Sequence, residues 1–122
     1  MLTEKDYCDY DTCVALKELG YVGICDAYYE QTGSEDYNRE FFRLSYTSIN
    51  RVSAPLLYQA HKFLREEKGL HIEIDRVGYD WLVSVIETKN NLCLAVKNRC
   101  QSYEEAFLEG IKEAIKILKE EK

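Results

Sequence analysis

The second half of the chain shows the apolar spacing of a helix followed by three strands. After Ser53-Ala54-Pro55, apolar residues recur three and four positions apart up to Gly69, which predicts a helix with one buried face. Three runs of alternating residues follow, separated by turns at Gly78 and at residues 89–91, and they predict an antiparallel meander. Their apolar positions are Leu70, Ile72, Ile74, Trp81, Val83, Val85, Leu92, Leu94 and Val96.

A capping box marks the start of the last predicted helix. The Ser102 hydroxyl can accept from the N–H of Glu105, while the Glu105 carboxylate can reach back to the backbone of Ser102. Acidic residues follow this start and lysines lie toward the end, which suits the helix dipole. We therefore expect a helix over about residues 103–119.

The first half gives weaker signals. Residues 1–10 are polar, and we expect them to be frayed. Asp11 or Thr12 can cap a short helix that Gly20 ends. Alternating residues over 21–30 and around Phe42, Leu44 and Tyr46 flank a polar turn, which predicts a β-hairpin.

Together these elements give the order α–β–β–α–β–β–β–α. Antiparallel hairpins with helices laid on one face form an α+β fold. We therefore predict a two-layer sandwich, with a mainly antiparallel sheet of four to five strands and about three helices. A chain of 122 residues is long enough for one such domain, so we expect a single domain over residues 1–122.

Composition points to a small soluble protein of the cytoplasm. No apolar run is long enough to span a membrane, and the first ten residues lack the apolar core of a secretory signal. The five cysteines are odd in number and contain no C-x-x-C pair, so neither a disulfide framework nor a zinc site is expected.

Charge is concentrated at the start of the chain. Residues 1–40 hold ten acidic and three basic side chains, together with six of the ten tyrosines. Tyrosine is enriched at protein interfaces, so this third could bind a basic protein partner. The alternative is a solvated surface with tyrosines at the edge of the core. The candidate contact residues are Tyr21, Tyr28, Tyr29, Glu30, Asp36 and Tyr37.

Two further functions stay open as alternatives. Helix, three strands and helix is the order of a double-stranded-RNA-binding domain, but Glu104 and Glu105 lie where such a domain needs basic side chains, so binding of nucleic acid is not expected. A sheet edge could instead pair two copies of the chain. A divergent relative of the double-stranded-RNA-binding fold could also bind a small anion.

An enzyme remains the other alternative. No nucleotide-binding, zinc-protease or serine-hydrolase motif occurs, so we assign no catalytic, cofactor-binding or metal-ligating residue. His61 is expected to be exposed on its helix. An unrecognised active site would need a pocket that joins His71, Glu73 or Cys100 to a second polar group.

Short motifs along the chain resemble a group of uncharacterised proteins. The motifs are Ala15-Leu16-Lys17-Glu18-Leu19-Gly20, Ser53-Ala54-Pro55, Gln59-Ala60, Phe63-Leu64-Arg65-Glu66, Gly69 and Tyr103-Glu104-Glu105-Ala106. Similar motifs occur in short proteins from gut-bacterial genomes and from their phages or mobile elements. The resemblance implies a phage-related protein, and it implies no activity or site residue. We expect such a protein to act through protein contacts.

Overall fold

The computed structural model describes residues 4–22, 28–30, 41–42 and 51–120. The chain divides into two compact units, Met1–Leu56 and Leu57–Lys122, which are described separately below. Helices and antiparallel strands are both present, so the α+β class is confirmed. The expectation of one domain over residues 1–122 stays a prediction.

The described residues of the N-terminal unit form two helical segments and three short strands. The strands are antiparallel in the order β2-β1-β3. The elements are a 3-10 helix η1 at Glu4–Asp6, the helix α1 at Tyr10–Glu18, and the strands β1 at Tyr28–Glu30, β2 at Phe41–Phe42 and β3 at Arg51–Ser53. The hairpin predicted from the sequence does not include β3.

The start of the chain differs from the frayed terminus that its polarity predicts. Tyr7 forms an antiparallel β-bridge with Leu56, and the N–H of Cys8 donates to the carbonyl of Pro55 at 2.9 Å. Tyr7 and Cys8 are both buried. These two apolar side chains, set among acidic neighbours, hold the segment in place because burying them is favourable.

The cap of α1 lies earlier than predicted. Oδ1 of Asp9 accepts from the N–H of Thr12 at 3.0 Å, and the backbone of Asp9 is extended, as an N-cap requires. Asp9, not Asp11 or Thr12, is therefore the N-cap, and the buried Thr12 belongs to the first turn. Gly20 follows the end of the helix with φ +100°, as predicted for a glycine in that position.

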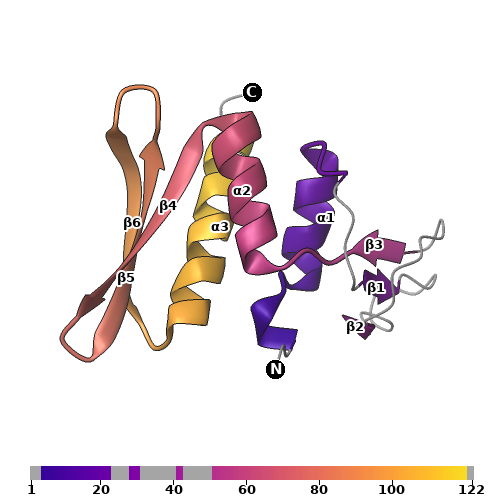
Figure 1. Ribbon diagram of the computed structural model, residues 1–122, viewed down its shortest axis with the longest axis horizontal. Helices are drawn as coiled ribbons and strands as arrows, with labels where there is room; N and C mark the ends of the chain where they lie inside the picture. Colours follow the sequence, from indigo (N-terminus) through magenta and orange to yellow (C-terminus); the bar gives the residue numbers. More distant parts are fainter. Residues whose placement is uncertain (1–3, 23–27, 31–40, 43–50, 121–122) are drawn as a thin grey trace. The chain divides into compact units, whose positions relative to one another are not determined.

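The C-terminal unit has the predicted helix–strand–strand–strand–helix order. Its sheet is antiparallel with strand order β4-β5-β6, and both helices lie on one side of it (Figure 1). The elements are α2 at Leu57–Lys68, β4 at Leu70–Val77, β5 at Asp80–Glu87, β6 at Leu92–Cys100 and α3 at Tyr103–Glu120.

The core of this unit forms between the helices and the sheet. Leu64 of α2 and Ile111 of α3 are fully buried, and they face the inward side chains of β4 and β5. Those inward side chains are Leu70, Ile72, Val83 and Val85. The alternation read from the sequence therefore corresponds to one face under the helices.

Helix ends in this unit follow local sequence with small shifts. α2 begins two residues after Pro55 and ends before Gly69, whose φ is +70°. The Ser102 hydroxyl accepts from the N–H of Glu105 at 3.1 Å, as predicted. The Glu105 carboxylate accepts from the N–H of Gln101, one residue before the position that a capping box would use.

The finer description of the fold is not confirmed. Instead of one sheet with four or five strands, the described residues form two sheets of three strands each. Among the described residues, no helix has the length and apolar character that crossing a membrane requires.

Candidate functional site

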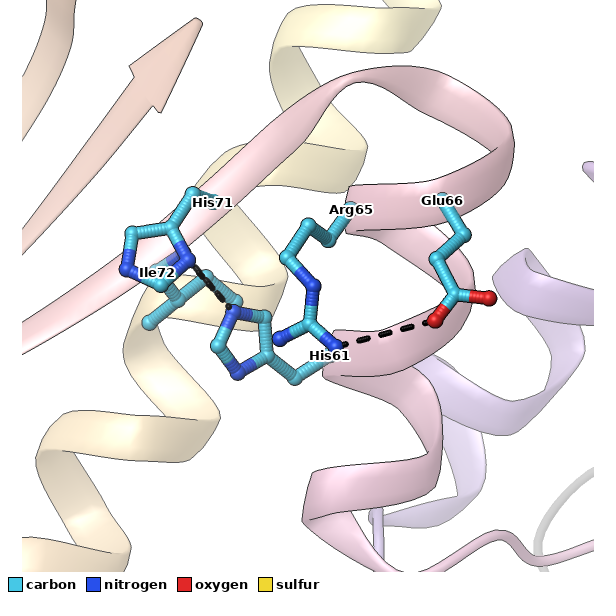
Figure 2. A network of polar contacts seen from close by, with 5 residues as sticks. All are labelled: His61, Arg65, Glu66, His71 and Ile72. Carbon is cyan, nitrogen blue, oxygen red and sulfur yellow. Dashed lines mark hydrogen bonds and ion pairs between the residues drawn. The ribbon is translucent and has the colours of Figure 1, made fainter. Parts of the chain in front are cut away.

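One amide on the outer edge of β4 is covered by a side chain from α2. The N–H of Ile72 donates to Nε2 of His61 at 3.1 Å, and Figure 2 shows the His61 side chain reaching from α2 toward the strand that carries His71 and Ile72. His61 also packs edge-to-face on Phe107 of α3, with ring centroids 5.7 Å apart. A strand edge that is covered in this way no longer offers that amide to another chain.

His61 and His71 form a pair beside this edge. Nε2 of His61 lies 3.2 Å from Nδ1 of His71. Because Nε2 of His61 accepts from the Ile72 amide, the proton between the rings belongs to Nδ1 of His71. Burial, with further contributions from His71 and Arg65, lowers the pKa of His61 to about 4. The exposed position expected for His61 is therefore wrong: its ring is partly buried and neutral near pH 7.

The opposite edge of the same sheet is open. β6 pairs with β5 on one side, and within residues 51–120 no strand pairs with its other side. Three aliphatic side chains of this nine-residue strand are exposed: Leu92 by 53%, Leu94 by 40% and Val96 by 57%. We call the unpaired side of Leu92–Cys100 and these three side chains the β6 edge.

Two irregularities shape the β6 edge. The register with β5 shifts between Val85 and Ile86, and again between Trp81 and Val83, so β6 carries one extra residue at each place. Arg99 lies within the second shift and has φ +60°, a left-handed conformation that is uncommon outside glycine. Between the shifts, regular pairing is limited to a short run around Val96.

Basic side chains surround the aliphatic ones. Lys97 donates to Oε2 of Glu109 on α3 at 2.9 Å, and this hydrogen bond raises the pKa of Lys97. Lys89 and Arg99 are exposed, and neither forms an ion pair with any residue that the structure describes. The free positive charge of the edge therefore lies at Lys89 and Arg99.

The predicted contact residues of the first third do not form one exposed group among the residues that the structure describes. Tyr29 is only 5% exposed; its hydroxyl donates to the carbonyl of Cys8 at 3.1 Å, and its ring packs on Tyr10. Tyr21 is partly buried. Tyr28 and Glu30 lie in β1, whereas Asp36 and Tyr37 lie outside the described residues. Tyr29 therefore serves the packing of the N-terminal unit.

The residues considered for catalysis are not brought together. His71 lies beside His61, Glu73 is exposed, and Cys100 is 3% exposed. Burial, aided by Glu105 and Glu109, raises the pKa of the Cys100 thiol, which disfavours the reactive thiolate. Within the described ranges, no three metal-ligating side chains cluster.

Two features of this site were not predicted. Nothing in the spacing of His61 and His71 indicates that a helix residue reaches the strand edge, because the contact depends on how α2 lies beside β4. The openness of β6 follows from its place as the last strand of a meander, and the sequence carries that signal.

Comparison with models of known protein families, with curated proteins and with solved structures gave no match. The resemblance to phage-associated proteins of gut bacteria therefore stays a prediction.

Proposed function

We propose that this protein acts by binding another protein, and that the β6 edge is its contact surface. The supporting observation is that a nine-residue strand with three exposed aliphatic side chains has no strand on its outer side in the described part of the chain. Such an edge presents unpaired N–H and C=O groups, which can pair with an extended segment of a second chain.

The contrast between the two edges of the sheet supports the β6 edge as the contact surface. His61 occupies the amide of Ile72 at the β4 edge, whereas Leu92, Leu94 and Val96 leave aliphatic surface in water beside the β6 edge. Burying that surface against a partner would be favourable by about 25 cal/mol for each Å² removed from water. Because three aliphatic side chains are exposed on β6, the β6 edge gains more than the β4 edge by being covered.

We prefer the β6 edge as the contact surface. Binding of a basic partner through the acidic first third of the chain remains a second proposal. Tyr29 is committed to the N-terminal unit through Cys8 and Tyr10. The RNA-binding alternative has less support because Glu104 and Glu105 occupy the first turn of α3. Association with phages or mobile elements is part of the proposal on motif evidence alone.

The test compares two valines that are equally exposed. Val96 on β6 and Val77 at the end of β4 are both 57% exposed, so Val96→Lys and Val77→Lys make the same chemical change at an open edge and at a hairpin end. We expect proteins captured by the wild-type chain and by Val77→Lys to be lost from Val96→Lys. Hydrogen exchange on the complex should show new protection over residues 92–98. Equal capture by both variants would contradict the proposal.

A further inference from the structure

We propose that the occupant of the β6 edge is an extended acidic segment of a different protein, an inference that rests on the proposed function. Residues 88–103 contain three basic side chains and no acidic one. This run is locally basic in a chain whose net charge is -6. The edge therefore selects a partner of the opposite sign.

The charges flank the aliphatic side chains on both sides. Lys89 lies in the turn before Leu92, and Arg99 follows Val96 toward the end of the strand. An added strand would therefore place its apolar side chains against residues 92–96, in the first half of β6, and its carboxylates near Lys89 and Arg99. Because Lys97 is already paired with Glu109, the unpaired Lys89 and Arg99 are the groups that recognise those carboxylates.

A second copy of this chain fits the same edge poorly. Pairing β6 with a second copy of itself would bring together two edges of the same positive charge. Like charges directly across two strands are destabilising. A nucleic acid would satisfy the basic groups, but it would leave Leu92, Leu94 and Val96 without an apolar partner. The mixed character of the edge therefore favours an acidic peptide segment.

The test uses the full-length chain as bait for a displayed library of random twelve-residue peptides. We expect enriched peptides to alternate apolar residues in the middle and to carry Asp or Glu at the ends. The double variant Lys89→Glu/Arg99→Glu reverses the edge charge, and Lys116→Glu/Lys119→Glu makes the same change on exposed lysines of α3. The dissociation constant of an enriched peptide, measured by fluorescence anisotropy, should rise about tenfold or more in the first variant and stay unchanged in the second.

Other outcomes separate this inference from the proposed function. The enriched peptides could be basic or uncharged and still lose binding in Val96→Lys. This result would contradict the proposal of an acidic partner and would support the β6 edge as the contact surface. A concentration-dependent dimer that Val96→Lys disrupts would make a second copy the occupant. Binding of duplex RNA that Lys89→Glu/Arg99→Glu abolishes would assign the edge to nucleic acid. Absence of all binding that depends on β6 would overturn both proposals.

Discussion

A β-carbon placed on Gly110 would lie 2.6 Å from Cγ2 of Val83 and 2.8 Å from Cγ2 of Ile72. Gly110 is in the middle of α3, where glycine is less favourable than alanine by about 1 kcal/mol. The helix therefore gives up local stability at this position and gains close contact with β4 and β5. This approach lets α3 cover the inner face of the sheet.

We expect Gly110→Ala to lower the free energy of unfolding by about 1–3 kcal/mol, because overpacking outweighs the gain in helix propensity. Denaturant unfolding would measure the change. Adding Val83→Ala should relieve the clash, so the double variant should lose less stability than the two single variants together. A Gly110→Ala protein that is more stable than the wild type would contradict this packing.

His61 should make stability depend on pH. Its pKa is about 4 in the folded protein and 6.5 ordinarily, so between these values the unfolded chain binds a proton that the folded chain does not. The contribution is complete above about pH 6.5 and is lost as pH falls toward 4. Because the ring is only partly buried, we expect it to amount to about 1–2 kcal/mol.

The matched variant for this test is His61→Gln, which keeps a hydrogen-bond acceptor but does not titrate. Chemical denaturation at pH 7.5, 6, 5 and 4 would give both stability curves. We expect the wild type to lose stability relative to His61→Gln across this range. Parallel curves would show that His61 is not held in its neutral form.

Ser102 should contribute to α3 through its hydroxyl. Ser102→Ala removes the acceptor for the N–H of Glu105, and we expect a loss of about 1 kcal/mol. Ser102→Asp, which restores an acceptor, should recover most of it. Thermal unfolding of the three proteins would measure the effect, and equal midpoints for Ser102→Ala and the wild type would count against the cap.

Thr12 offers a test of the N-terminal unit. Its Oγ1 is buried and has no hydrogen-bond partner among the residues that the structure describes. We expect Thr12→Val to keep or raise the stability by up to about 1 kcal/mol, because an unpaired buried hydroxyl is replaced by a methyl group of similar size. Thr12→Ser keeps the hydroxyl, loses the methyl group and should be less stable than the wild type in the same unfolding assay.

Local signals predicted the C-terminal unit well because its element ends are set by nearby residues. Gly69 and Ser102 mark helix ends in both the sequence and the structure. In the N-terminal unit the decisive contacts are distant in sequence. Tyr7 pairs with Leu56, and Cys8 bonds to Pro55, so neither polarity nor periodicity near residue 7 could reveal them.

The candidate site also has one part that the sequence predicted and one part that it did not. Alternation at Leu92, Leu94 and Val96 predicted a strand, and the structure shows that all three side chains are exposed. The contact between His61 and Ile72 joins a helix to a strand edge eleven residues later. Sequence spacing alone fixes neither the rotation of α2 nor its distance from β4.

The open strand also affects how the isolated protein behaves at high concentration. Unpaired strand edges with aliphatic side chains promote aggregation, and charged neighbours act as gatekeepers that slow it. Lys89 and Arg99 are placed to have this role at the two ends of β6. Neutralising Lys89 and Arg99, or raising the salt concentration, would therefore make the purified protein aggregate sooner.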